Sequence, residues 1–439
     1  MKSLSMKNRT IIAIVLFVAI FAALIAVASV YDFQVSQILT KNALKPGDYI
    51  ANDLYGVVGE AVGTSPIYIV LSVCTAILCW FFARNFGKKW WGIVLSVAFA
   101  IAGAVAWWFY IKDAFRYVLE HAAAQVGSSA GAIVYEFRHD GAVVAIEWLI
   151  ALTIQALNVL AFKNLKPETL KKLFWWVVAV IAAVVVANIL IMIIKDPVGR
   201  MRYRAINSDV GQLLINSGVV QGYTPWYVSN GQPSEDIIKM FVDAYPGASD
   251  AFKSFPSGHT CAAGMSYALI MLPDVIDFKS EKSKKGVKIA CWIIPIAITM
   301  LVAISRIVVG AHYMSDVTFG GTLAFVCMIV AREIFVCKGG HFFALFPSAA
   351  PKKLAKVEVG VEGTEGFDAT DIDVDAAEQE TQEDEFVDEL IEKFVQDTQN
   401  LDSEDVSDEK REEAAISEEQ ADKVSQEIAD NLRDGVISE

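Results

Sequence analysis

Two short segments that contain histidine carry the side chains best suited to chemistry in this 439-residue chain. Residues 255–260 read Phe-Pro-Ser-Gly-His-Thr, and residues 305–316 begin with Ser-Arg and end on a histidine at 312 and an aspartate at 316. Each segment precedes an apolar run that has the character of a membrane helix. The first turn of a helix presents unpaired N–H groups and the positive end of its dipole. The segments therefore predict an anion site suited to phosphate.

The spacing of His312 and Asp316 indicates that these two side chains act as a pair. Residues four apart share one face of a helix. We expect the carboxylate of Asp316 to accept one imidazole N–H and so to fix the tautomer of the ring. The other ring nitrogen then keeps a lone pair and can act as a nucleophile.

A third segment, residues 195–204, places four cations on a short stretch that follows an apolar run. They are Lys195, Arg200, Arg202 and Arg204. A charged side chain at mid-bilayer costs about 2.5–3.5 kcal/mol, so these cations belong at the membrane surface or beside a polar cavity. One guanidinium group can donate two parallel hydrogen bonds to two phosphate oxygens, which favours a phosphate ligand. Binding to anionic lipid headgroups is the alternative.

Together the three segments resemble the signature motifs of the type 2 phosphatidic acid phosphatase superfamily, which shares its core with vanadium-dependent haloperoxidases. The resemblance rests on Lys195 with Arg202, on residues 256–259, and on Ser305-Arg306 with His312 and Asp316. It covers residues 185–336 as a motif core. One position departs from the pattern, because Tyr203 stands where a proline usually follows the arginine.

The resemblance implies a role for each matching residue. His312 would attack phosphorus to form a phosphohistidine, Asp316 would orient it, and His259 would protonate the leaving oxygen. Six positions would hold the phosphoryl oxygens: Lys195, Arg202, Ser257, Gly258, Ser305 and Arg306. Because side chains supply the positive charge, the resemblance implies no metal and no cofactor. A neutral His312 and a protonated His259 predict a bell-shaped pH profile.

Long apolar runs provide the elements that must position these residues. They lie at 11–30, 67–83, 91–111, 141–162, 174–194, 260–273, 288–307 and 317–336. Runs of this length predict an all-α, polytopic membrane helix bundle of about eight spanning helices. We expect the first helix to be retained rather than cleaved as a signal peptide.

Basic residues fall on one side of these runs, which the positive-inside rule assigns to the cytoplasm. Both chain termini are then cytoplasmic, and segments 31–66, 112–140, 195–259 and 308–316 face outward. All three motif segments would lie at the outer face of a plasma membrane. Within the longest outer segment, Ser234 and the residues after it predict a short capped helix, either a lid at a lipid entrance or a packed loop helix.

The chain divides by composition into residues 1–350, an integral-membrane phosphatase domain, and residues 351–439, an acidic cytoplasmic tail. The tail holds 30 acidic and 8 basic side chains, a net charge of −22. It has too few apolar residues to form a core, so we expect it to be mostly disordered. Two stretches with helical spacing of apolar residues leave open that the tail docks a cytoplasmic protein partner.

The six cysteines all lie within apolar runs or at their edges. None forms a close pair on a loop, which argues against disulfides and against a zinc site. We therefore expect the cysteines to be packing residues.

These observations predict a membrane phosphatase that hydrolyses a lipid phosphate or diphosphate, of the phosphatidate, phosphatidylglycerol phosphate or polyprenyl diphosphate class. Its expected partners are the lipid phosphate substrate and membrane lipids, with no nucleic acid. Two alternatives stay open. The same intermediate could pass its phosphoryl group to an alcohol, which would make the protein a phosphotransferase, or the protein could be a membrane anchor whose acidic tail recruits a partner.

Overall fold

The computed structural model describes residues 5–126, 139–245, 247–278 and 280–345, and within these ranges the chain is helical and has no strands. Seven helical segments within these ranges are long and apolar enough to cross a membrane, which confirms the predicted all-α polytopic bundle. They are formed by α1 (Met6–Thr40), α2 (Leu54–Val62) with α3 (Ser65–Phe86), α4 (Trp90–Val126), α6 (Gly141–Ala161), α7 (Pro167–Val198), α13 (Glu281–Val308) and α14 (Met314–Ala331). The acidic tail and its expected disorder and partner lie outside the described residues.

The predicted run 260–273 is not a single spanning helix. It forms α11 (Gly258–Gly264), a 3₁₀ segment η2 (Met265–Met271) and α12 (Leu272–Val275). Pro273 lies in the first turn of α12, where its missing N–H costs no hydrogen bond. Most of this segment is buried, and Gly264 allows α11 to approach α14 so closely that a Cβ would lie 2.5 Å from Ala324 Cβ. The segment is therefore an interior packing element.

Several helices extend beyond their apolar runs into segments that we expected to be outer loops. The first helix continues to Thr40, α4 continues to Val126, and α2 occupies part of residues 31–66. In α1 the buried positions are Ala28, Asp32, Ser36 and Thr40, which recur every four residues along one face. Protein rather than lipid covers these polar residues, which explains why apolarity alone did not mark the helix end.

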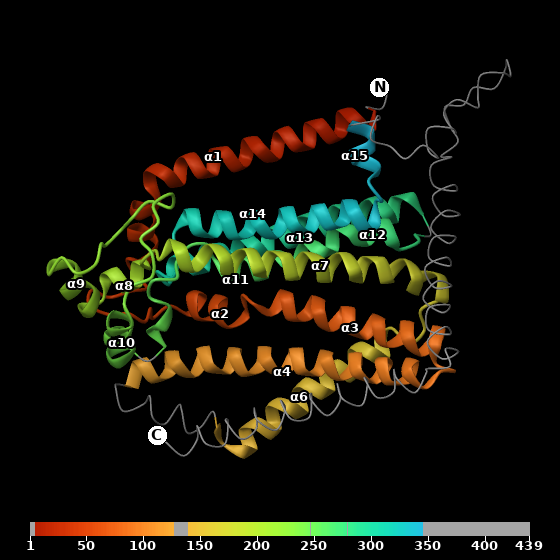
Figure 1. Cartoon of the computed structure of the whole chain (residues 1–439), viewed down its shortest axis with the longest axis horizontal. Helices are drawn as coiled ribbons and strands as arrows, with labels where there is room; N and C mark the ends of the chain where they lie inside the picture. Colours follow the sequence, from red (N-terminus) through yellow and green to blue (C-terminus); the bar gives the residue numbers. More distant parts are fainter. Residues whose placement is uncertain (1–4, 127–138, 246, 279, 346–439) are drawn as a thin grey trace, which may run out of the picture. The chain divides into compact units, whose positions relative to one another are not determined.

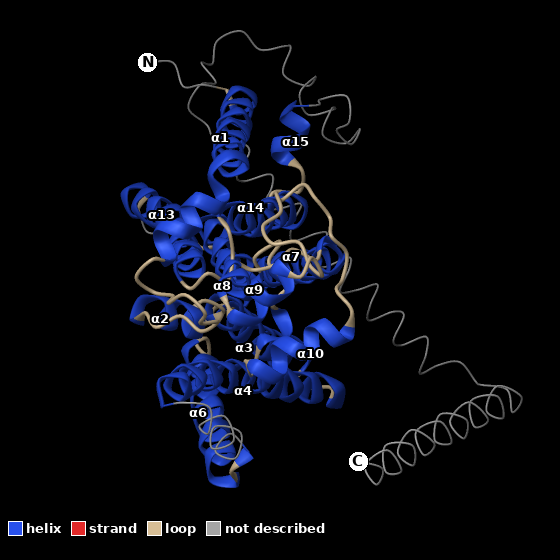
Figure 2. Ribbon diagram, turned by 90° about the vertical axis from the view of Figure 1, so that its left-hand side faces the viewer, coloured by secondary structure: helices blue, strands red, loops and turns tan. Residues whose placement is uncertain are grey.

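The long helices lie side by side in successive layers (Figure 1). The central core lies among α3, α7, α11 with η2, and α14. On one side α1 contacts α13 and α14, and on the other α4 packs between α3 and α6. The view in Figure 2 shows the same succession of helices and loops from α1 to α6.

Short elements gather at one end of the bundle, around a second core. They are α8 (Tyr203–Asn207), α9 (Asp209–Asn216), α10 (Glu235–Ala244) and the 3₁₀ turn η1 (Ala248–Asp250). The helix predicted after Ser234 is present as α10, although the Ser234 side chain makes no capping hydrogen bond. Phe241 of α10 is fully buried against Phe252 and Tyr49, which favours the packed loop helix over the lid.

Candidate active site

The motif residues converge at this end of the bundle from three places in the chain. The end of α7, the loop before α11, and the turn between α13 and α14 supply them. The first place depends on Gly199, which ends α7 with a φ of +53°. A Cβ there would lie 1.6 Å from the carbonyl oxygen of Gly231, so the turn that directs the following arginines inward requires glycine.

His312 is buried and held by a backbone carbonyl. Its Nδ1 lies 2.5 Å from the carbonyl oxygen of Ser254. A carbonyl can only accept, so Nδ1 carries the proton and Nε2 keeps the lone pair. The predicted free ring nitrogen is therefore available, but the residue that fixes the tautomer is Ser254, which the sequence did not single out.

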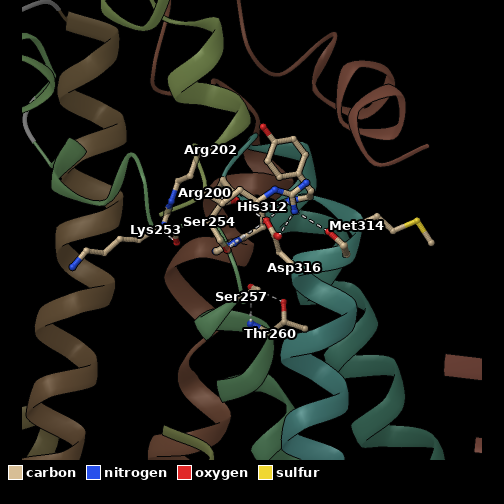
Figure 3. Close-up of polar contacts among 12 residues, drawn as sticks. Arg200, Arg202, Lys253, Ser254, Ser257, Thr260, His312, Met314 and Asp316 are labelled. Carbon is tan, nitrogen blue, oxygen red and sulfur yellow. Dashed lines mark hydrogen bonds and ion pairs between the residues drawn. The ribbon is translucent and has the colours of Figure 1, made fainter. Parts of the chain in front are cut away.

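Asp316 does not hydrogen-bond His312 directly, as we expected it to, but contacts it through Ser254. Its Oδ2 is 3.8 Å from His312 Nδ1 and accepts hydrogen bonds from the Ser254 hydroxyl at 2.5 Å and from the Tyr313 N–H at 2.8 Å. The helix α14 begins only at Met314, so the two residues do not share a helical face. The carboxylate thus acts on the imidazole by its charge and by fixing Ser254 (Figure 3).

A buried ion triad fixes Asp316 in turn. Arg200 donates from Nη1 to Asp316 Oδ1 at 2.6 Å and from Nη2 to Asp32 Oδ2 at 2.8 Å. All three side chains are fully buried, and Asp32 also accepts from the N–H and hydroxyl of Ser315. The remaining Nε of Arg200 donates to the carbonyl of Thr224. With these partners, Arg200 is a positioning residue and its guanidinium is committed to the protein.

Asp32 belongs to α1, far from the three motifs in sequence. An ionisable residue next to a long apolar run is a functional candidate by default, so the sequence did contain a signal for it. The signal did not identify its partner among the four cations of residues 195–204. The motif resemblance assigns roles to Lys195 and Arg202 and leaves Arg200 without one.

Two other arginines have only part of their hydrogen-bonding capacity satisfied. Arg306 donates from Nη2 to Glu60 Oε1 at 2.9 Å, and its buried Nε and Nη1 have no hydrogen-bond partner among the described residues. Arg202 pairs through Nη2 with Asp250 Oδ2 at 2.9 Å, and its buried Nε is likewise unpartnered in the described part of the chain. Unsatisfied buried donors are costly. These three nitrogens of Arg306 and Arg202 can bind an acceptor-rich anion.

The start of α11 also contributes to the candidate site. Ser257 is the N-cap of this helix, and its hydroxyl lies 3.0 Å from that of Thr260. The N–H of Ser257 donates to the carbonyl of Asp316, which joins the starts of α11 and α14. A Cβ on Gly258 would lie 3.6 Å from Lys195 Nζ, so the ammonium sits beside the helix N-terminus. Lys195 and the free N–H groups of α11 thus face one region.

His259 lies within electrostatic reach of His312, Arg202 and Arg306. Its ring packs edge-on against Tyr117 of α4 at 5.7 Å between centroids, and its buried Nε2 has no partner among the described residues. His259, more than fifty positions before His312 in the sequence, therefore lies near enough for the charge of one ring to act on the other.

Ser305 is placed differently from the other predicted phosphate ligands. Its hydroxyl donates to the carbonyl of Val302 at 2.7 Å. A Cβ on Gly59 of α2 would lie 2.1 Å from Ser305 Oγ, so the two helices are in direct contact at this point. In this structure Ser305 packs α13 against α2, and its hydroxyl proton is bonded to the Val302 carbonyl.

Both imidazoles are biased toward their neutral forms. Burial lowers the pKa of His312 to about 3, with Arg202 and Lys195 adding to the shift and Asp316 opposing it. Burial and the charge of Arg306 lower the pKa of His259 well below 6.5. A neutral His312 suits a nucleophile. A protonated His259, as the resemblance implies, then requires an anion in the site to offset the neighbouring cations.

The low pKa of His312 predicts that its ring stays neutral well into the acid range. In ¹⁵N-histidine protein we expect the His312 resonances to show no protonation between pH 7 and 5. A ring with the ordinary pKa of about 6.5 would be almost fully protonated at pH 5. The chain has five histidines, so His312→Asn identifies the signals by difference. A titration midpoint near 6.5 would contradict the structure.

Among the described residues, one group of side chains is close enough to share a metal ion: Glu333, Cys337 and His341. This group lies at the other end of α14, away from the candidate active site.

Comparison with known proteins agrees with the motifs. The model of the PAP2 superfamily matches residues 175–337, from within α7 to just past the π-helical turn (Arg332–Val336) that follows α14. The predicted resemblance is thereby confirmed over this segment. No curated protein and no solved structure matches the chain. The matched segment holds every motif residue, whereas Asp32, Glu60 and Tyr117 lie outside it.

Proposed function

Because residues 175–337 match the model of the PAP2 superfamily, which favours a phosphatase, we propose that this membrane protein hydrolyses a lipid phosphate or diphosphate through a phosphohistidine on His312. One observation carries the proposal. Four buried nitrogens without a partner among the described residues, on Arg202, Arg306 and His259, accompany a neutral His312 with a fixed tautomer. A phosphoryl group supplies acceptors for those nitrogens and an electrophile for His312.

The proposed reaction has two balanced steps. In the first, the lone pair on His312 Nε2 forms a bond to phosphorus while the bond from phosphorus to the leaving oxygen breaks, and His259 gives that oxygen its proton. In the second, the water oxygen forms a bond to phosphorus while the bond from phosphorus to His312 Nε2 breaks, and His259 takes a proton from the water. Inorganic phosphate leaves and both rings are restored.

The protein's charges match the charges that develop along this path. As His312 forms its new bond, the ring becomes cationic, and the Ser254 carbonyl and the Asp316 carboxylate stabilise it. The equatorial oxygens of the phosphoryl group would accept from Arg202, Arg306, Lys195 and the N–H of Gly258. We expect these fixed cations to make a metal unnecessary for the chemical step.

His259 as the general acid predicts an effect that depends on the leaving group. We expect His259→Gln to lower kcat for a lipid phosphate, whose alkoxide leaves with difficulty, by about 10²–10³-fold. For p-nitrophenyl phosphate, whose phenolate leaves without a proton, the loss should be below about tenfold. A matched His139→Gln variant, at an exposed position, should change neither rate. Equal losses on both substrates would remove His259 from the acid role.

The distribution of basic residues supports an outer location for the site. Lysines cluster before α7 and in the first turns of α13, whereas the site lies at the opposite ends of these two helices. Since positively charged loops remain in the cytoplasm, we place the site at the extracytoplasmic face of the plasma membrane. Substrates would then reach it from the outer leaflet.

Sealed, right-side-out vesicles test both substrate class and sidedness. We expect added phosphatidate, phosphatidylglycerol phosphate or polyprenyl diphosphate to release inorganic phosphate without permeabilisation, and the rates to rank the three substrates. Vesicles with His312→Ala protein are the matched blank. Cleavage that appears only after permeabilisation would reverse the proposed orientation. Transfer to an added alcohol, without release of phosphate, would replace hydrolysis by phosphotransfer.

A further inference from the structure

The end of α14 remote from the active site has an unusual backbone. After Ala331 the helix widens into a π-helical turn (Arg332–Val336), and the chain then reverses through Lys338 and Gly339, with φ of 48° and 79°. It continues as α15 (Gly340–Leu345). A left-handed conformation at a residue other than glycine is uncommon, and single π-helical turns are frequent at functional sites.

This reversal brings together three side chains that a straight helix would separate. Glu333, Cys337 and His341 are spaced four residues apart, so the outer two would lie about 12 Å apart along a straight helix axis. Instead, one ligating atom from each of the three lies within 4.8 Å of the others. His341 Nδ1 is 2.9 Å from Glu333 Oε2, and the other carboxylate oxygen accepts from the N–H of Phe342.

From this geometry we infer that Glu333, Cys337 and His341 form a Zn²⁺ site. A thiolate, an imidazole and a carboxylate are all zinc ligands, whereas Ca²⁺ and Mg²⁺ select oxygen ligands alone. Three protein ligands leave the fourth tetrahedral position for water. The side chains of His341 and Glu333 are 37% and 22% exposed, so an ion can reach them from solvent.

The site changes the interpretation of the cysteines. Five of the six are buried, in keeping with packing, but Cys337 is partly exposed beside two further ligands. Our expectation of no zinc site rested on the lack of close cysteine pairs, a criterion that does not detect a Glu-x₃-Cys-x₃-His arrangement folded back by a turn. With the orientation proposed above, the site faces the cytoplasm, where thiols stay reduced.

The ion would join two parts of the bundle. Its ligands come from the π-helical turn and from α15, and α15 packs against α1. A bound ion would therefore hold α15 in its reversed position beside the first helix. This binding is independent of phosphatase chemistry, because the site lies at the far end of α14, which is about 27 Å long for its 18 residues.

Metal titration of the full-length protein in detergent tests the inference. Zn²⁺ is titrated in competition with a chromogenic chelator, and Co²⁺ replaces it for absorption spectra. We expect one equivalent of Zn²⁺ to bind, with Cys337→Ser, Glu333→Gln and His341→Gln each weakening binding by about 100-fold. A Cys291→Ser variant, at a buried cysteine on α13, should bind as the unchanged protein does.

The cobalt spectrum of the unchanged protein gives a second measurement that requires no variant. A thiolate-to-cobalt charge-transfer band in that spectrum would support the site, and its loss in Cys337→Ser would assign the thiolate. Absence of that band, absence of saturable zinc binding, or equal binding by Cys337→Ser and the unchanged protein would each overturn it.

Discussion

Replacing His312 with alanine should lower kcat on a lipid phosphate by at least about 10⁴-fold. Without the nucleophile the covalent intermediate cannot form, so the whole proposed reaction is lost and not only one stabilising contact. The ring is buried and held by the Ser254 carbonyl, so no other described imidazole is placed to substitute for it without repacking. Steady-state release of inorganic phosphate measures the loss.

Trapping the intermediate separates this explanation from a simple folding defect. With a ³²P-labelled lipid phosphate and an alkaline quench, which preserves phosphohistidine, the unchanged protein should carry label on His312. His312→Ala should carry none, although it elutes as a folded protein in detergent. The exposed His139→Ala variant should label normally. Label on another residue, or activity within tenfold of normal, would contradict the mechanism.

Replacing Arg200 with methionine should cost about 3–5 kcal/mol of stability, because it leaves the carboxylates of Asp32 and Asp316 buried without their shared cation. Activity should also fall, because Asp316 and through it Ser254 and His312 lose their fixed positions. The midpoint of thermal unfolding in detergent and kcat are the two measurements. The matched control is Lys172→Met, which removes a cation whose Asp277 partner is 78% exposed and should cost about 0–1 kcal/mol.

A double variant distinguishes charge balance from packing. Adding Asp32→Asn to Arg200→Met removes one of the two buried negative charges, so part of the lost stability should return. Activity should not return, because Asp316 still lacks its partner. Arg200→Met and Asp32→Asn are also measured singly. If the double variant loses as much stability as the two single variants lose in total, the three side chains are not coupled and their role is packing alone.

The candidate site residues could be recognised in the sequence because their signals are local. Histidine beside serine and glycine at the start of an apolar run identifies the helix N-terminus of α11, and the spacing from Arg306 to Asp316 spans one tight turn. Such patterns depend on a few neighbouring residues, so they can be recognised however the remaining helices are arranged. The long apolar runs likewise predicted the spanning helices, apart from the interior segment of α11, η2 and α12.

The supporting contacts were out of reach because each joins residues that only tertiary structure brings together. The motif spacing assigns Arg202 a role, but nothing in the local sequence shows that Arg200 binds Asp316 or that the Nε of Arg202 lacks a partner among the described residues. The motif predicted a phosphate ligand at Ser305, and the sequence did not show that Gly59 of α2 packs directly against it. Helix ends were also misplaced where protein covers polar residues, as at Asp32 in α1.

The participation of α1 in the triad has a consequence for biogenesis. Asp32 emerges from the ribosome 168 residues before Arg200 and 283 before Ser315. During that interval neither Arg200 nor Ser315 has been synthesised, so the carboxylate of Asp32 lacks the partners it has in the folded protein. The triad can therefore form only late in synthesis, and a nascent chain that stops short of α14 leaves α1 without these contacts.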